Sequence, residues 1–488
     1  MSVQTEIKPI RALLSEDWLA LLIGLAIVGV ALVGLWGPDL LGWAVSTSVW
    51  TDASAALAAT SKIYSQLGGL ASLGVTYLAL LIVLSAAAWS LGHKISAFAP
   101  AFTAVFALAY GSWFIGNHAH LAAITSAELQ KFGITWSLKL TNEGGYIVAL
   151  LVGVIIANFF PRFAQWLNEA IRPELYIKIA IVILGAFLAV GALNRLSLAS
   201  SVLVRGLAAI VEAYLIYWSV VYFVARRFFG FSREWSVPLA SGISICGVAA
   251  AIATGGAIRA RPHVAVLVSS LVVVFAVVEI LILPFLAQTF LWNEPLVAAA
   301  WMGLAIKTDG AAVAGGGITE ALISAKAAAE GVHYQPGWIL GTTAAVKVFI
   351  DIFIGIWAFI LGYIWTNHIN PTKEGERAKA VEIWQRFPKF ILGYVVAFVL
   401  TLWIGWGAPA DTTAKLTASI GEANTFRVIF FILTFFSIGV LSNFKKLWAD
   451  GLGKLAAVYV VSLFGFIIWV GLLISWIFFS GVKPPLVS

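Results

Sequence analysis

Residues 238–260, PLASGISICGVAAAIATGGAIRA, form a long apolar segment with no charge between Pro238 and Ile258. Glycine and hydroxyl residues interrupt it, whereas a span that only anchors a protein favours Leu, Ile and Val. A broken helix at membrane depth is tolerated where protein or water satisfies the freed backbone groups. Transporters bind substrate at such breaks. The alternative is close helix packing through small residues.

The composition identifies the class of protein. The chain has 488 residues, of which 61% are hydrophobic and 11% charged, whereas a soluble domain carries about 25% charge. We therefore expect an all-α polytopic membrane protein. The net charge of +7 comes from loops, which fits the positive-inside rule and does not indicate nucleic acid. A single cysteine, Cys246, excludes an intramolecular disulfide and a Cys-based metal site.

Apolar runs of suitable length predict about thirteen transmembrane helices. They lie at 18–36, 67–90, 97–116, 144–160, 175–194, 201–224, 236–257, 262–285, 296–317, 337–365, 390–407, 424–443 and 454–480. The stretch 38–66 is rich in Ala, Ser and Thr and is expected to form a surface helix. Residues 1–17 are polar and precede a full-length span, so no cleavable signal is expected.

Basic residues predict the orientation in the inner membrane. The loops 225–235 and 366–389 carry several Lys and Arg, so both are predicted to be cytoplasmic together with the N-terminus. Thirteen crossings then place the C-terminus outside. Arg259 and Arg261 disagree with this pattern, because they would face outward. Either they face a cavity or the seventh segment does not cross fully.

The predicted spans divide into an N-terminal extension of three helices, residues 1–143, and two groups of five. The first group covers 144–290; the second covers 291–365 and 390–488, on either side of the loop 366–389. An odd number of spans per group makes the two orientations opposite. The fourth member of each group contains Ser and Gly: GISICG in the first and Thr434–Phe444 in the second. Paired interruptions at matching positions are typical of transporter repeats.

Six ionisable residues in the predicted spans are candidates for the site, because charges inside a membrane usually face a cavity or a partner. They are Glu212, Glu279, Lys307, Asp309, Lys347 and Asp351. Lys347 and Asp351 are four residues apart and can pair on one helix face. Lys307 and Asp309 are two apart and point in different directions, so they need other partners, a ligand or a break between them.

At these residues the chain resembles the YeiH-like sulfate exporter family. GISICGVAA is similar to the family signature G-x-SICG-x-[SA]-A, and KTDGAAVAGGG to H-D-x-A-Q-V-V-A-A-G. The residues matching the second pattern are Asp309, Ala311, Val313 and Gly317, whereas Thr308 and Ala312 depart from it. The resemblance covers about 144–480. It implies a fold like that of sodium/proton antiporters and bile-acid symporters, in which two inverted five-helix repeats have broken helices that cross, and it implies export of sulfate, sulfite or a small sulfonate.

We therefore predict a secondary active transporter that exports a small anion, coupled to a proton or sodium gradient. The predicted substrate-binding residues are Ser241, Ser244, Cys246, Gly247, Lys307, Thr308 and Ser437. The predicted coupling-ion residues are Asp309, Lys347 and Asp351. Carboxylates serve as relays in such proteins, and hydroxyl groups can donate to oxyanion oxygens.

The expected partners are the anion, the coupling ion and membrane lipid; no cofactor, bound metal or nucleic acid is expected. The sequence allows a homo-oligomer. Two alternatives remain open: a cation/proton antiporter, with Asp309 binding the cation, and an anion channel. An enzyme is not expected, because neither an HExxH nor a GxSxG motif occurs.

Overall fold

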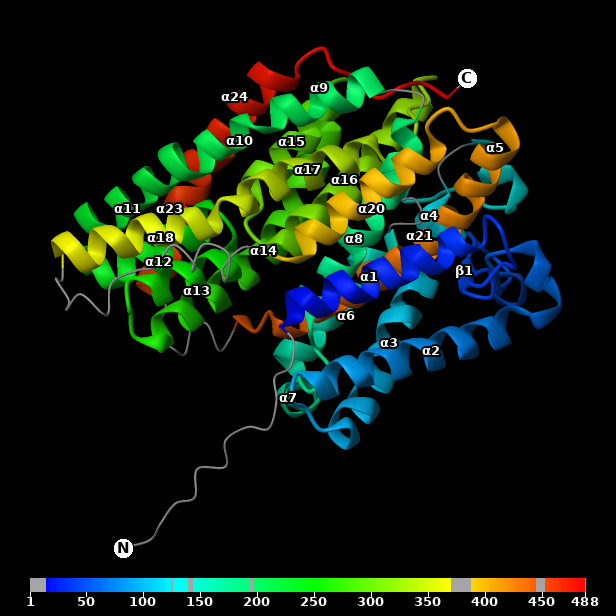
Figure 1. Ribbon diagram of the computed structural model, residues 1–488, viewed down its shortest axis with the longest axis horizontal. Helices are drawn as coiled ribbons and strands as arrows, with labels where there is room; N and C mark the ends of the chain where they lie inside the picture. Colours follow the sequence, from blue (N-terminus) through cyan, green and yellow to red (C-terminus); the bar gives the residue numbers. More distant parts are fainter. Residues whose placement is uncertain are drawn as a thin grey trace, which may run out of the picture.

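The computed structural model describes residues 15–123, 126–138, 144–193, 196–369, 388–444 and 453–487. The chain forms an elongated bundle of helices (Figure 1), which confirms the all-α membrane class. Eight helices in the described part are long and apolar enough to span a membrane, and shorter apolar helices accompany them. The basic cluster predicted to make 366–389 cytoplasmic, including Lys373 and Arg377, lies outside the described residues.

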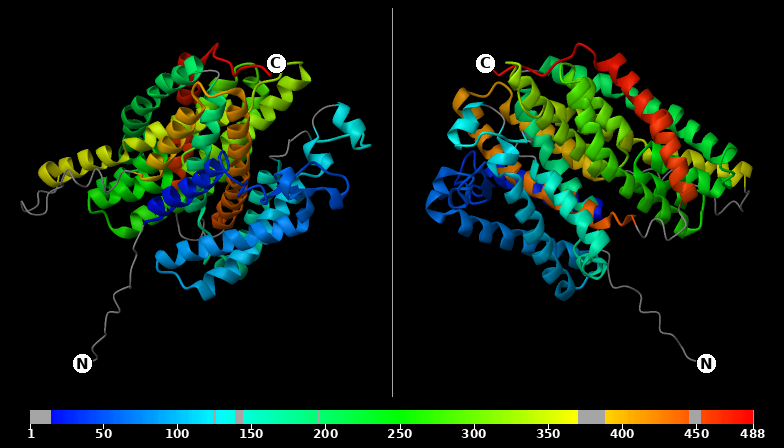
Figure 2. Two further views of the ribbon diagram at one scale, coloured as in Figure 1. Left: turned by 45° about the vertical axis from the view of Figure 1, so that its right-hand side comes forward. Right: turned by 180° about the vertical axis from the view of Figure 1, so that it is seen from behind.

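The N-terminal extension lies along one flank of the bundle (Figure 2). It contains α1 (Glu16–Val33), α2 (Gly69–Ser90) and α3 (Ile95–Gly116), with the short helices α4 (Ala119–Ala122) and α5 (Ser126–Lys131) after them. Helix α1 packs against α8 (Pro173–Ala192), where Asp17 forms an ion pair with Lys178 at 2.9 Å. The extension is therefore joined to the rest of the bundle by a charged contact as well as by apolar packing.

The prediction of a surface helix at 38–66 is wrong. This stretch contains an antiparallel hairpin of β1 (Val45–Thr47) and β2 (Leu57–Ala59), together with the 3₁₀ turns η1 (Ala53–Ala55) and η2 (Lys62–Leu67). Asp39 and Asp52 each accept hydrogen bonds from backbone N–H groups two or three residues further on. Such local side-chain bonds compete with a helix and favour turns.

The remaining helices outside the two interrupted spans form the body of the bundle. Their bounds are α6 (Gly144–Phe159), α7 (Pro161–Leu167), α8, α9 (Leu196–Gly206), α10 (Ala208–Val211), α11 (Trp218–Arg227), α14 (Pro262–Phe290), α17 (Trp338–Ile352), α18 (Ile354–Ile364), α20 (Phe390–Gly405), α21 (Ala410–Leu441), α23 (Gly453–Ser462) and α24 (Ile468–Phe479). Three π-helical turns continue these helices: η3 (Glu212–Tyr217), η4 (Trp365–Ile369) and η6 (Leu463–Ile467).

The seventh predicted span is broken, and it does not cross the bundle. Helix α12 (Arg233–Ser244) turns back into α13 (Gly247–Ala257). The two arms lie side by side, because a Cβ on Gly255 would lie 3.5 Å from Pro238 and one on Gly242 would lie 3.5 Å from Ala251. Both ends of the segment therefore lie at one end of the bundle.

An ion pair between the two ends of this hairpin confirms the return. Arg261, just after α13, lies 2.9 Å from Glu234, at the start of α12. Arg259 and Arg261 thus share an end of the bundle with Arg227, which resolves their disagreement with the other loop charges. Of the two explanations left open, incomplete crossing is the correct one.

The ninth predicted span is a second hairpin. Helix α15 (Pro295–Ala305) and α16 (Asp309–Ala329) are separated by three non-helical residues. The Thr343 hydroxyl on α17 donates to Ala299 O at 2.8 Å, and a Cβ on Gly316 would lie 2.7 Å from Thr343. One residue of α17 therefore contacts both arms. Helix α14 connects the hairpins, so they enter from opposite ends of the bundle (Figure 1).

The hairpins correct the expectation of broken helices that cross. Three of the four arms have 11 or 12 residues and are about 17 Å long, roughly half of the ~30 Å hydrocarbon core. The fourth arm, α16, has 21 residues. The count of thirteen spans is not confirmed, since two predicted spans are hairpins. The other eleven correspond to near-continuous helical stretches in the described part of the chain.

The predicted interruption at Thr434–Phe444 is also wrong. Helix α21 runs from Ala410 to Leu441 without a break. Its small residues serve helix packing instead: a Cβ on Gly439 would lie 2.9 Å from the Cα of Gly153 on α6. Small residues allow two backbones to approach closely within a membrane. The second interruption belongs to residues 306–308.

Candidate functional site

The tips of the two hairpins contact each other in the middle of the bundle. Cys246 and Ile306 have extended backbone conformations, and the Gly247 N–H donates to Lys307 O at 2.7 Å. A side chain at Gly247 would be obstructed, because its Cβ would lie 2.5 Å from Val272 and 3.0 Å from Thr308. Glycine is therefore required where the two backbones meet.

Lys347 on α17 holds both tips. Its ammonium donates to Ile245 O at 2.7 Å and to Lys307 O at 3.2 Å. These carbonyls follow the C-terminal ends of α12 and α15, which carry partial negative charge. The same ammonium forms an ion pair with Asp309 at 3.7 Å. The anticipated partner of Lys347 was Asp351, one turn along α17; the ion pair is instead with Asp309, across the tip.

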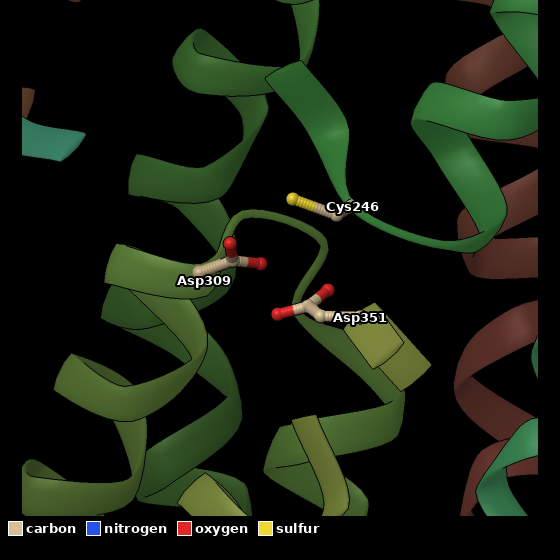
Figure 3. Close-up of side chains that lie close together, drawn as sticks. All are labelled: Cys246, Asp309 and Asp351. Atoms are coloured by element: carbon tan, nitrogen blue, oxygen red, sulfur yellow. The ribbon is translucent and has the colours of Figure 1, made fainter. Parts of the chain in front are cut away.

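Asp309, Asp351 and Cys246 point toward one another (Figure 3), and the Lys347 ammonium forms its ion pair with the first of them. One carboxylate oxygen from each aspartate and the cysteine sulfur all lie within 4.8 Å of one another, and all three residues are buried. The Oδ1 atoms of Asp309 and Asp351 have no hydrogen-bond partner. Two carboxylates and one ammonium carry a formal net charge of −1. A proton or a monovalent cation would neutralise this cluster.

Lys307 belongs to a second buried cluster, on α15, η3 and their neighbours. Its ammonium donates to Leu304 O and lies 4.4 Å from the centre of the Tyr217 ring. Glu212 and Glu279 are the nearby carboxylates. The ammonium of Lys307 is therefore directed away from Asp309, and the break between the two residues makes this separation possible.

The glutamates of this second cluster are only partly hydrogen-bonded. Glu279 accepts a bond of 2.5 Å from the Tyr459 hydroxyl. Both carboxylate oxygens of Glu212 lack a hydrogen-bond partner, and Tyr217 donates to Ile467 O at 2.8 Å. Buried charges of this kind are costly unless they are paired or neutralised.

The predicted hydroxyl ligands divide into engaged and unengaged groups. Thr308 caps α16 by accepting from the Ala311 N–H at 3.1 Å, and Ser241 accepts from the Trp218 indole at 2.9 Å. Ser244, which ends α12, and Ser437, on α21, are buried without a hydrogen-bond partner for the hydroxyl. Ser244 and Ser437 are therefore the hydroxyls available to a ligand.

A large cavity in the described part of the chain lies away from the tips. It measures about 660 Å³ and its walls include Phe187, Trp338, Tyr394 and Phe398. These residues are apolar or aromatic, so the cavity offers little to a charged ligand. Arg427 on α21 was not among the predicted site residues, although it is a charged residue inside the predicted span 424–443.

Two hairpins that enter from opposite ends and meet at buried ionisable groups define a polytopic membrane protein with a polar centre. The chain belongs to the UPF0324 family: residues 121–458 match the family model described as "Conserved hypothetical protein 698". A UPF0324 membrane protein of Nitrosomonas europaea is 39% identical over 475 residues, covering 96% of this chain and 97% of the relative.

Two further relatives show how far the similarity extends. A UPF0324 membrane protein of Rhodopirellula baltica is 30% identical over 363 residues, covering 73% of this chain and 58% of the relative. An uncharacterized protein of Archaeoglobus fulgidus is 48% identical over 171 residues, covering 31% of this chain and 91% of the relative. These matches confirm the YeiH-like family resemblance and the multi-pass membrane class.

Proposed function

We propose that the protein is a secondary transporter of a small anion such as sulfate, sulfite or a small organosulfonate, coupled to a proton or sodium gradient. One observation carries the proposal: two hairpins from opposite ends meet at a buried cluster of Lys347, Asp309 and Asp351. In the proposed cycle either hairpin withdraws while the other stays in place. This is the requirement for alternating access to a single site.

The charges at the tips explain coupling. With both aspartates ionised, the cluster has a net charge of −1 and repels an anion. Protonation of one aspartate, or binding of Na⁺ between Asp309 and Asp351, makes the cluster neutral. Lys347 and the N-terminal ends of α13 and α16 can then attract an anion, since helix N-termini carry partial positive charge. The anion and the coupling ion therefore bind together.

Ser244 and Ser437 complete the proposed substrate site. Their buried hydroxyls have no hydrogen-bond partner, and hydroxyl groups donate readily to oxyanion oxygens. Lys307 contributes indirectly in this proposal, because its carbonyl joins the tips while its ammonium is engaged near Glu212 and Glu279.

Transport in proteoliposomes tests the proposal. The purified protein should accumulate radiolabelled sulfate or a small sulfonate in a saturable manner when a pH or sodium gradient is imposed. Asp309→Asn should retain downhill flux and lose its dependence on the gradient. Vesicles that contain wild-type protein and show no saturable flux of any anion in a panel would contradict the function.

A cation/proton antiporter is the second candidate, and the cluster of Cys246, Asp309 and Asp351 favours it. In that case Na⁺ or another monovalent cation would be the substrate and protons would leave the same carboxylates. Cation-driven proton release that needs no anion would select this alternative. We further propose an inner-membrane location with the arginine-rich end that holds Arg227 and Arg261 in the cytoplasm and the C-terminus outside.

A further inference from the structure

A second polar cavity, of about 320 Å³, lies between the bundle and the N-terminal extension. Its walls come from β1 and α3 of the extension and from α6, α8, α16, α17 and α21 of the bundle. It lies at the end where the second hairpin enters, because Glu320 on α16 and Leu340 on α17 line it. We refer to this cavity as the vestibule.

The vestibule contains one buried cation, Arg427. This residue is 8% exposed and lies in the middle of α21. Its guanidinium is held by aromatic rings, with ring centres at 5.5 Å for Phe187 and 5.0 Å for Phe431. Its Nε donates to Asn424 Oδ1 at 2.5 Å. The position of the guanidinium is thus fixed from three sides.

The rest of the guanidinium has no protein partner among the described residues. The structure records no carboxylate within ion-pair distance of Arg427, and no hydrogen bond from either terminal nitrogen. An arginine inside a spanning helix is costly and is usually paired. Its planar fork of donors fits two oxygens of a sulfate, sulfonate or carboxylate group.

The acid among the residues that line the vestibule, Glu320, is engaged by backbone N–H groups. Glu320 accepts hydrogen bonds from the N–H groups of Gly337, Ile339 and Leu340, at 2.8, 3.0 and 3.0 Å. Its carboxylate therefore caps the N-terminus of α17, where negative charge is favoured. On the extension side, Thr47 and Tyr110 offer hydroxyl groups 2.8 Å apart. The vestibule thus combines a fixed cation with neutral hydrogen-bonding groups.

The vestibule and the hairpin tips lie along the same helix, α21. Arg427 precedes Thr434 by seven residues on α21, a rise of about 10 Å at 1.5 Å per residue. A Cβ on Gly310, next to Asp309, would lie 3.4 Å from Thr434. Helix α21 therefore connects the two places, with Arg427 nearer the end of the bundle.

We propose that the vestibule is a separate binding site for a small oxyanion, sulfate or an alkyl sulfonate, with Arg427 as its main ligand. The N-terminal extension supplies β1 and α3 to its wall, which gives the extension a part in recognition. A role for this site in delivering substrate to the tips rests on the proposed function. Binding of an oxyanion at the vestibule is independent of the proposed function.

The test uses a cysteine placed in the vestibule. Ser46 on β1 lines the cavity, so a cysteine is introduced there by Ser46→Cys. Two methanethiosulfonate reagents of similar size label it: the 2-sulfonatoethyl reagent is anionic and the 2-trimethylammonioethyl reagent is cationic. We expect Arg427→Gln to reduce the anionic-to-cationic rate ratio about tenfold, the effect of one unit charge several ångströms away at intermediate dielectric. Arg427→Lys should keep most of the preference. The full-length protein without Ser46→Cys gives the background from Cys246.

Sulfate protection is the second measurement. Sulfate should slow labelling of Ser46→Cys by the cationic reagent at constant ionic strength. Chloride should not have this effect. Arg427→Gln should abolish the protection by sulfate. Arg226→Gln, a change at the other end of the bundle, is the matched control and should change neither measurement. An unchanged rate ratio and unchanged protection in a folded Arg427→Gln variant would overturn the vestibule site. That result would leave anion flux in proteoliposomes intact if the proposed function is correct. Protection by sulfate without any flux would support the site and contradict the function.

Discussion

Removing the Lys347 ammonium should destabilise the protein through the hairpin tips. Lys347→Met keeps the length and apolar stem of the side chain, but Ile245 O loses its donor and Asp309 loses its ion-pair partner. Breaking one side of a buried pair costs about 3–5 kcal/mol, and the orphaned carbonyl accounts for about 1–3 kcal/mol of such a loss. We therefore expect Lys347→Met to reduce the free energy of unfolding by about 3–5 kcal/mol.

The partner aspartate allows the two contributions to be separated. In Lys347→Met the ionised Asp309 has no counter-charge, so adding Asp309→Asn should restore about 2 kcal/mol. The Ile245 carbonyl stays unpaired in both variants, and recovery is therefore incomplete.

Equilibrium unfolding in mixed micelles, followed by circular dichroism, gives the required free energies. Lys326→Met is the matched control, since Lys326 is an exposed residue of α16 and its loss should cost little. A deficit below about 1 kcal/mol for Lys347→Met would refute the assignment of Lys347 as the residue that holds both tips. A double variant no more stable than Lys347→Met would refute the charge argument.

Three further predictions concern the hairpins. Gly247→Ala should lower the thermal midpoint of unfolding by several degrees, because its methyl group would lie 2.5 Å from a neighbouring valine side chain. Gly255→Ala is the control, since its methyl group would meet ordinary contacts at 3.5 Å. Equal midpoints for the two variants would contradict the tip geometry. Cysteines introduced at Arg259 and at Arg227 should react with a membrane-impermeant reagent from the same side of the membrane, and labelling from opposite sides would show that the first hairpin crosses. Cys246 is 1% exposed and should resist maleimide in the resting protein but react under conditions that separate the tips; rapid labelling in all conditions would contradict the closed contact.

The sequence predicted a break within residues 238–260 and allowed one between Lys307 and Asp309, but it placed the second interruption at Thr434–Phe444 and gave the geometry of neither break. Glycine and hydroxyl residues around Cys246 indicated the first break, and the different directions of Lys307 and Asp309 left a break between them as one of three explanations. Hydropathy cannot tell a hairpin from a crossing helix, because both contain about 22 apolar residues in a row. The informative signal was Arg259 and Arg261: their conflict with the other loops reflected a segment that returns to its starting end.

Partners at the site could not be predicted because they depend on contacts between distant segments. Spacing along α17 suggested Asp351 for Lys347, but the ammonium crosses to Asp309 and to two carbonyls on separate hairpins. The Ser and Gly of Thr434–Phe444 resembled a break, although Gly439 serves close packing against α6. Local composition is the same in both cases, and only the neighbouring helix distinguishes them.

The tip contact also has a consequence for how the protein is made. The first hairpin emerges from the ribosome about a hundred residues before Lys347. The Ile245 carbonyl therefore lacks its hydrogen-bond donor while α14, the second hairpin and α17 are synthesised. An unpaired carbonyl is costly in lipid. We therefore expect the first hairpin to remain near the insertion machinery, or at the membrane surface, until α17 enters. Truncations that end before residue 347 should leave the hairpin open to protease, and chains that include α17 should protect it.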